Sequence, residues 1–203
     1  MKILAFDTCL DKMYVVLRTE EKILSSEVVE NTDSKYHSAF LISTISRVLQ
    51  ENNVEPKDLD VIGINIGPGS FTGIRACTTV ARVMAQQLNI KAIGVSSLEV
   101  LSKIEETNPL VALDARKNKA YLWCDGEIQG AIELEKVQEL IASGKYKVIT
   151  DDRLQKILGG KSYQQEAYPL GEILSELVLE KLKTSSGNWA ELTPLYIQPP
   201  PMG

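Results

Sequence analysis

Histidine is almost absent from this chain, with His37 the only one among 203 residues. The three cysteines, Cys9, Cys77 and Cys124, are odd in number and widely spaced, which argues against a disulfide framework. One histidine and scattered cysteines also lack the ligand spacing of a zinc site. We therefore predict no metal site, and unpaired cysteines suit the reducing environment of a cytoplasmic protein.

A catalytic nucleophile is missing as well. His37 has no Ser, Cys or carboxylate partner at a spacing typical of a triad, so we interpret it as a surface or interface residue. The apolar N-terminal stretch Ile3 to Phe6 stops at Asp7, so neither a signal peptide nor a membrane span is predicted. The net charge of -5 disfavours this chain as the main contact to a nucleic-acid backbone.

A glycine-rich turn is the strongest positive signal. The segment Gly67 to Arg75, Gly-Pro-Gly-Ser-Phe-Thr-Gly-Ile-Arg, follows an apolar run and opens a helical pattern that continues to about Leu88. Gly67 and Gly69 permit backbone angles closed to other residues, and either Ser70 or Thr72 can cap the helix. The turn is either an anion site at a helix start or a tight strand-to-helix connection. It is not a P-loop, since no Gly-Lys-Ser/Thr ends it.

The first half of the chain predicts the order βββαβαβα. Period-two and period-3.6 patterns, separated by turn residues, define these elements. The expected strands are Lys2 to Thr8, Met13 to Thr19, Ile23 to Val29, Leu59 to Ile66 and Ile90 to Val95, and the expected helices are Lys35 to Glu51, the central helix to Leu88, and Ser96 to about Glu106.

The pattern then begins again. Leu110 to Ala115 mirrors Ile3 to Thr8, and a Lys-x-Tyr follows each strand at the same distance. Such a repeat predicts a duplicated α/β fold with lobes at 1–108 and 109–198 and a disordered tail at 199–203. Fewer elements are recognisable in the second lobe, where we expect helices at Gln138 to Ala142, Leu154 to Leu158 and Gly171 to Lys183, and a strand at Lys147 to Thr150.

The segment Ile64 to Leu98, with Gly-Pro-Gly-Ser-Phe-Thr-Gly-Ile-Arg at its centre, resembles the signature of the bacterial TsaB (YeaZ) family. Thr193 to Ile197 is similar to the closing segment of that family. The resemblance implies an actin-like, ribonuclease H-like (ASKHA) duplicated fold, with a mixed five-stranded sheet in the N-terminal lobe and a reduced second lobe. It also implies that this chain is a non-catalytic partner in the formation of threonylcarbamoyladenosine on tRNA.

In ATP-using relatives of that fold, the first-strand aspartate and the following hairpin handle metal and phosphate. The matching positions form a vestigial nucleotide-site candidate comprising Asp7, Thr8, Gly67, Gly69, Ser70 and Asp114. The simpler interpretation is that Asp7 and Asp114 cap strand ends and satisfy turn amides. We favour the simpler one because the second lobe shows no convincing glycine-rich adenosine loop, so this chain alone is expected to bind no cofactor.

The catalytic paralog of the same pathway resembles this chain around the glycine turn but carries His-x-x-x-His on the following helix, where one-turn spacing directs both imidazoles to one metal. The matching positions here are Ser97 and Leu101. Leu101 offers no ligand atom. ATP and a metal ion are therefore expected on partner subunits, a TsaD-like catalytic paralog and a TsaE-like ATPase.

The central helix has more apolar and small residues than one sheet face requires. Either neighbouring helices of its own lobe cover them, or they form a subunit interface, and we expect both to contribute. The resemblance favours an interface, since it implies a homodimer in isolation and a heterodimer with the catalytic paralog. The residues predicted to form it are Tyr36, His37, Phe40, Ile74, Thr78, Ala81 and Ala85.

The resulting hypothesis is an accessory subunit that supports formation of N6-threonylcarbamoyladenosine at position 37 of tRNAs reading codons that begin with A, with tRNA contacted only through the complex. The alternative is a stand-alone actin-like ATPase or kinase that uses Asp7 and Asp114. A peptidase has less support, because the sequence shows neither a metal pair nor a Ser/His/Asp arrangement.

Overall fold

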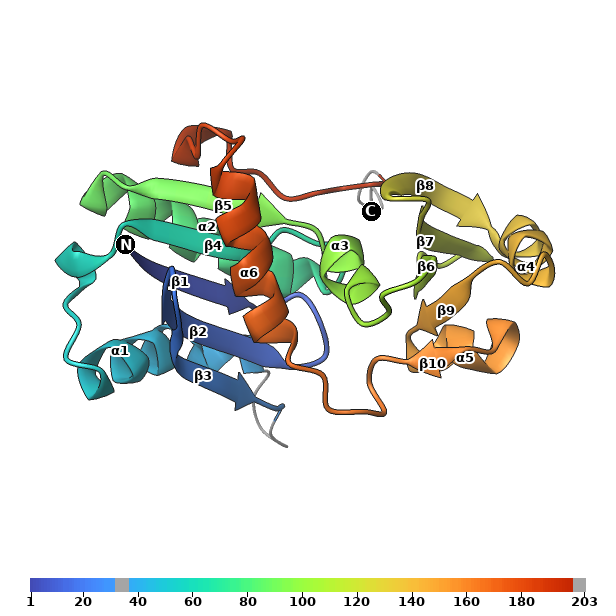
Figure 1. Ribbon diagram of the computed structural model, residues 1–203, viewed down its shortest axis with the longest axis horizontal. Coiled ribbons are helices and arrows are strands. Elements are labelled where there is room, and N and C mark those ends of the chain that lie inside the picture. Colours follow the sequence, from blue (N-terminus) through green and yellow to red (C-terminus); the bar gives the residue numbers. More distant parts are fainter. Residues whose placement is uncertain (32–36, 199–203) are drawn as a thin grey trace. The chain divides into compact units, whose positions relative to one another are not determined.

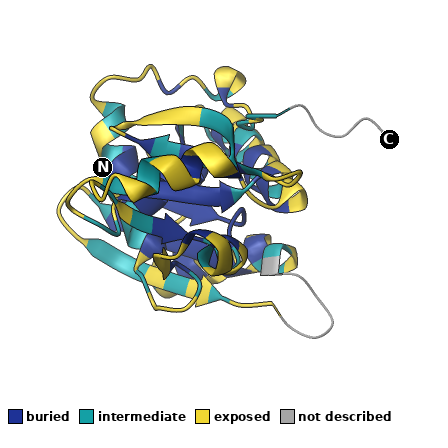
Figure 2. Ribbon diagram, turned by 90° about the vertical axis from the view of Figure 1, so that its right-hand side faces the viewer, coloured by how far each residue is buried: buried dark blue, intermediate teal, exposed yellow. Residues whose placement is uncertain are grey.

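The computed structural model describes residues 1–31 and 37–198, which divide into two compact units. The first unit comprises Met1–Ser97 and Pro169–Leu195, and the second comprises Leu98–Tyr168 and the segment from Tyr196 onward. Each unit is built on one sheet (Figure 1). Buried residues concentrate on the strands, and exposed residues on the outer sides of the helices (Figure 2).

The sheet of the first unit has the order β3-β2-β1-β4-β5. Strands β1 (Lys2–Asp7), β2 (Met13–Thr19) and β3 (Ile23–Val29) form an antiparallel meander. Strands β4 (Val61–Asn65) and β5 (Lys91–Val95) continue the sheet in parallel from β1. The predicted mixed five-stranded sheet is confirmed.

Helices cover both faces of this sheet. Because side chains alternate along a strand, Ile62 and Ile64 face a core shared with α1 (Leu41–Glu51) and α2 (Phe71–Leu88). Gly63, between them, faces α6 (Leu170–Leu182), where a Cβ atom would overlap Val178. The missing side chain lets α6 lie close to the sheet.

Several predicted helix bounds differ from the structure; α4 (Leu134–Ala142), for example, begins before the expected Gln138. Helix α1 begins at Leu41 and is preceded by a 3-10 turn, η1 (His37–Phe40), and the start that we expected at Lys35 lies outside the described residues. Helix α3 (Ser97–Ser102) ends before the expected Glu106. A second 3-10 turn, η2 (Pro56–Asp58), precedes β4, and a third, η3 (Trp189–Glu191), follows α6.

The second unit repeats the topology of the first. Its sheet has the order β10-β9-β6-β7-β8, which corresponds strand by strand to the first sheet when read from β8. Helices α4 (Leu134–Ala142) and α5 (Asp152–Leu158) contribute to its core. The strands are β6 (Pro109–Asp114), β7 (Lys119–Cys124), β8 (Glu127–Glu133), β9 (Lys147–Thr150) and β10 (Lys161–Ser162). The duplicated α/β fold is therefore confirmed, with a reduced edge strand β10 in the second copy.

The observed units differ from the predicted lobes in two respects. The opening segment of the first unit ends at Ser97 and not at 108, and α6 belongs to the first unit. We expected all residues of 109–198 to fold together, but α6 packs on the sheet of the first unit. Gly171 of α6 lies directly against the side chains of Tyr14 and Val16 on β2. The local sequence pattern indicates that a segment is helical, but it does not indicate which sheet the helix covers. The tail at 199–203 lies outside the described residues.

Among the described residues, no helix is both long enough and apolar enough to cross a membrane. Helix α2 is the longest, and polar residues interrupt it throughout.

We predict that Gly63→Ala destabilises the protein by about 1–3 kcal/mol, because the stiff, branched side chain of Val178 cannot rotate out of the way. Urea unfolding measures the effect. In a double-mutant cycle, Val178→Ala should relieve part of the cost of Gly63→Ala, since the two residues are in contact. Fully additive effects would contradict the proposed packing of α6 on this sheet.

Candidate functional site

A closed polar network lies at the carboxyl ends of β1 and β4. The buried Asp7 carboxylate accepts hydrogen bonds from Cys9 N at 2.5 Å and from Asn65 Nδ2 at 2.9 Å. Asn65 Oδ1 in turn accepts from Gly67 N at 2.8 Å and from Ser97 Oγ at 2.9 Å. Asp7 therefore holds its own strand end and the beginning of the glycine turn together.

The glycine turn packs directly against the end of β1. A Cβ atom at Gly73 would overlap the carbonyl oxygen of Thr8, and one at Gly69 would overlap that of Cys9. Ser70 N donates to Cys9 O at 2.8 Å. Only glycine permits this approach, so these positions are glycine for reasons of packing.

The first turn of α2 uses its polar groups within the chain. Of the two predicted caps, Ser70 is the N-cap, and its Oγ accepts from Gly73 N at 3.3 Å. Thr8 Oγ1 donates to Gly73 O at 2.7 Å. Of the two interpretations of the turn, an anion site or a tight strand-to-helix connection, these contacts and those of Gly67 and Gly69 favour the tight connection.

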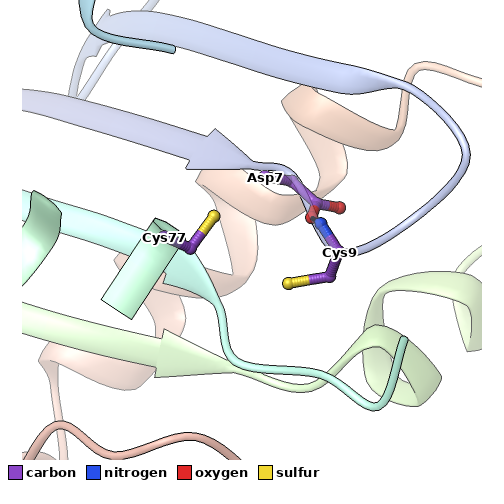
Figure 3. A group of neighbouring side chains, drawn as sticks. All are labelled: Asp7, Cys9 and Cys77. Atoms are coloured by element: carbon purple, nitrogen blue, oxygen red, sulfur yellow. Dashed lines mark hydrogen bonds between the residues drawn. The ribbon is translucent and has the colours of Figure 1, made fainter. Parts of the chain in front are cut away.

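Two cysteines join this network. Thr8 N donates to Cys77 Sγ at 3.1 Å, and Cys9 Sγ donates to Asn65 O at 3.2 Å. One ligand atom each from Asp7, Cys9 and Cys77 lies within 4.8 Å of the others, and all three residues are buried (Figure 3). Burial, the Cys77 thiol and the Asp7 carboxylate raise the pKa of the Cys9 thiol well above its usual value. No spacing signal in the sequence links Cys9 to Cys77.

Asp114 occupies the equivalent position in the second unit, at the end of β6. Its Oδ1 accepts from Arg116 N at 2.9 Å, two residues on, just as Asp7 Oδ1 accepts from Cys9 N. Its other oxygen forms an ion pair with the guanidinium of Arg153. Both strand-end aspartates thus satisfy turn amides, in agreement with the simpler interpretation of these residues.

The four α2 residues predicted to form a partner interface are buried within their own unit, so the free chain does not expose them: Ile74, Thr78, Ala81 and Ala85. Small residues on this side let α2 lie close to the sheet. Phe40 is partly buried against the same core. His37 begins η1, but its side chain is not described, and Tyr36 lies outside the described residues.

A different side of α2 is exposed. Ile42 of α1 and Val83 of α2 are 66% and 53% exposed, and they border an apolar groove of about 580 Å³. Ile45, Leu49 and Met84 contribute to its lining. The polar residues that line the groove are Ser46, Gln50, Glu55 and Thr79. The exposed apolar side chains of α2 thus lie on a different side of the helix from the residues predicted for an interface.

The family model described as "TsaD: tRNA N6-adenosine threonylcarbamoyltransferase" matches residues 21–150. The "tRNA threonylcarbamoyladenosine biosynthesis protein TsaB" of Buchnera aphidicola subsp. Schizaphis graminum is 29% identical over 76% of this chain and 80% of its own length. The TsaB protein of subsp. Acyrthosiphon pisum is 24% identical over 93% of each chain. This chain belongs to the TsaB (YeaZ) family.

Solved structures show the same fold. YeaZ from Pseudomonas aeruginosa superposes with a TM-score of 0.75 at 23% identity, covering 96% of this chain and 99% of that one. A second structure, described as similar to peptidase YeaZ from that organism, has a TM-score of 0.77 at 22% identity and covers 97% and 99%. This chain therefore has the fold of YeaZ.

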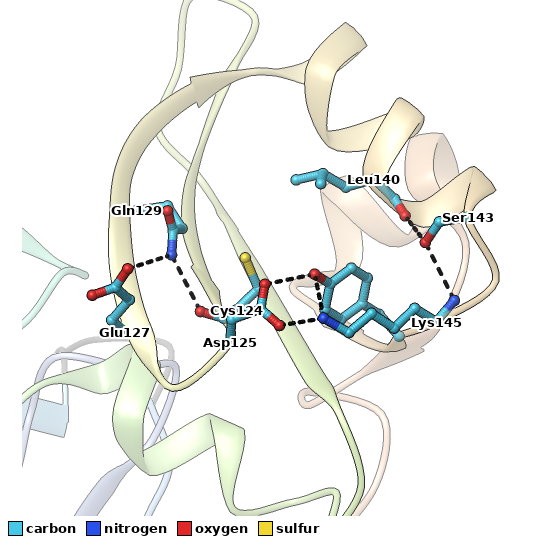
Figure 4. A network of polar contacts seen from close by, with 8 residues as sticks. Cys124, Asp125, Glu127, Gln129, Leu140, Ser143 and Lys145 are labelled. Carbon is cyan, nitrogen blue, oxygen red and sulfur yellow. Dashed lines mark hydrogen bonds and ion pairs between the residues drawn. The ribbon is translucent and has the colours of Figure 1, made fainter.

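A polar network also fastens the β7–β8 turn (Figure 4). Lys145 Nζ lies 2.6 Å from Asp125 Oδ1, and Tyr146 OH donates to Asp125 Oδ2 at 2.8 Å. The hydrogen bond from Lys145 and that from Tyr146 lower the pKa of the Asp125 carboxyl. Asp125 and Lys145 are exposed and Tyr146 is half-buried, so solvent screens the ion pair, and we assign this network a minor structural role.

We predict that Asp7→Ala lowers the free energy of unfolding by about 3 kcal/mol, because it leaves the buried Cys9 N–H and Asn65 amide without their charged acceptor. Asp125→Ala, which removes an exposed aspartate, should change it by less than about 0.5 kcal/mol. Chemical denaturation compares the two. Equal stability of Asp7→Ala and the parent would show that this carboxylate has no structural role and would reopen the nucleotide-site interpretation.

Proposed function

We propose that this chain is an accessory, non-catalytic subunit in the biosynthesis of N6-threonylcarbamoyladenosine at position 37 of tRNAs that read codons beginning with A. In this role it binds a TsaD-like catalytic paralog through the α1/α2 groove. The observation that carries the proposal is the exposed apolar groove on a chain of the TsaB family.

The groove has the properties of a helix-binding surface. Helices pack by inserting apolar side chains between those of a partner, and the groove between α1 and α2 presents such side chains to solvent at Ile42 and Val83. Covering a fully exposed Ile or Val contributes about 1.5–3 kcal/mol each. A matching helix pair on a partner would bury both at once, and a second copy of this chain could occupy the same surface when no paralog is present.

Several features support a non-catalytic role. The Ser97 hydroxyl donates to Asn65, and Leu101 is a buried leucine, so the positions that match the paralog's histidine pair hold no imidazole. The stand-alone ATPase or kinase alternative has less support, since the Asp7 carboxylate is bound to groups of its own chain. In the proposal, ATP and the catalytic metal ion belong to the TsaD-like and TsaE-like partners.

The role of this subunit is conformational. By binding one state of the catalytic paralog more tightly than another, it raises the population of that state, and a few kcal/mol of differential affinity is sufficient. The net charge of -5 favours tRNA contact through partner subunits.

We predict that Val83→Glu weakens binding of the TsaD-like paralog by at least about 100-fold, because burying an unpaired charge costs several kcal/mol and 1.4 kcal/mol is tenfold in affinity. Because Val83 is exposed in the free chain, the variant should fold normally. Sedimentation or titration calorimetry with the paralog from the same organism measures binding.

Val28→Glu is the matched control. Val28 lies on β3 and is 53% exposed, as is Val83, but it does not line the groove. The Val28→Glu variant should bind the paralog as tightly as the parent chain does. Unchanged binding by Val83→Glu would place the interface elsewhere, and loss of binding in both variants would point to a general charge effect.

A further inference from the structure

The ligand atoms of Asp7, Cys9 and Cys77 converge in the first unit. Asp7 ends β1, Cys9 lies two residues further on, and Cys77 is in the second turn of α2. Figure 3 shows their side chains grouped around one point. A tetrahedral zinc site, with Zn–S bonds of about 2.3 Å, sets two sulfurs about 3.8 Å apart. Since the atoms here lie within 4.8 Å of one another, side-chain movements of about an ångström suffice to form such a site.

The groups around the cluster are arranged as they are around metal ligands. Ligating carboxylates are usually fixed by hydrogen bonds, and Asp7 accepts from Cys9 N and Asn65 Nδ2. Ligating sulfurs commonly accept backbone N–H groups, and Cys77 Sγ accepts from Thr8 N at 3.1 Å. The ligands would therefore be oriented before any ion binds.

A neutral oxygen is available beside the sulfurs. Thr8 Oγ1 lies 3.1 Å from Cys77 Sγ, and its own proton is directed to Gly73 O at 2.7 Å. Thr8 Oγ1 thus lies close enough to Cys77 Sγ to serve as a fourth ligand.

We propose that Asp7, Cys9 and Cys77 form a buried binding site for a divalent metal ion of the zinc class, with two thiolates and one carboxylate oxygen as ligands. Soft thiolate ligands favour zinc or cadmium over magnesium or calcium. Binding converts both thiols to thiolates and releases one proton from each. The hydrogen bond from Cys9 Sγ to Asn65 O is lost in the exchange. The bound ion would link the end of β1 to α2, the helix that borders the apolar groove.

The test uses the full-length chain carrying Cys124→Ser, so that Cys9 and Cys77 are its only remaining cysteines. The chain is refolded under reducing, oxygen-free conditions with Cd²⁺ and separated from free ion. Elemental analysis and the thiolate-to-cadmium charge-transfer absorbance are then measured. We expect one tightly held ion per chain and absorbance corresponding to two thiolates. Adding Cys9→Ser or Cys77→Ser should lower the retained cadmium at least tenfold, and adding Thr79→Ala, an exposed position on α2, should leave it unchanged.

Circular dichroism establishes that each variant is folded. If the serine variants do not fold, the absorbance of the Cys124→Ser chain decides alone, because two thiolates per ion require both remaining cysteines. The proposal is overturned if this folded, reduced chain retains no cadmium, if one thiolate or none contacts the ion, or if folded Cys9→Ser and Cys77→Ser chains retain as much as the parent.

Discussion

The close approach of α2 to the end of β1 is the contact on which the first unit depends. Gly73 and Gly69 lie against the carbonyl oxygens of Thr8 and Cys9, where any side chain would collide. This contact brings the start of α2 onto the strand end, and the Asp7 and Asn65 side chains then satisfy the amides that converge there. In place of an open phosphate loop, the carboxyl edge of the sheet holds a packed and internally bonded turn.

The same contact determines which side of α2 is exposed. A helix held so near a sheet must present small residues to it, and Cys77, Ala81 and Ala85 meet this requirement. Larger apolar side chains, such as Val83, are then left on the outer side, next to α1. The packing of the helix and the exposed groove are thus two consequences of one constraint. In the proposed function, the partner binds the outer surface of these helices and not the edge of the sheet.

Much of the fold could be predicted because it is local. The bounds of β2 and β3 follow from the period-two residue pattern between turn residues. The repeat of strand, aspartate and hairpin predicted the second sheet. Three features could not be predicted for physical reasons. Helical periodicity does not say which sheet α6 covers, small residues suggest a buried side and an interface equally well, and the meeting of Cys9 with Cys77 depends on tertiary packing.

Amide hydrogen exchange of this chain, with the TsaD-like paralog and separately with ATP, tests the account most directly. Slower exchange confined to residues 41–51 and 71–88 on adding the paralog, with residues 7–9 and 67–73 unaffected by ATP, is the predicted result. Protection of residues 7–9 and 67–73 by ATP, with no change in α1 and α2 on adding the paralog, would contradict it and make the edge of the sheet the functional site.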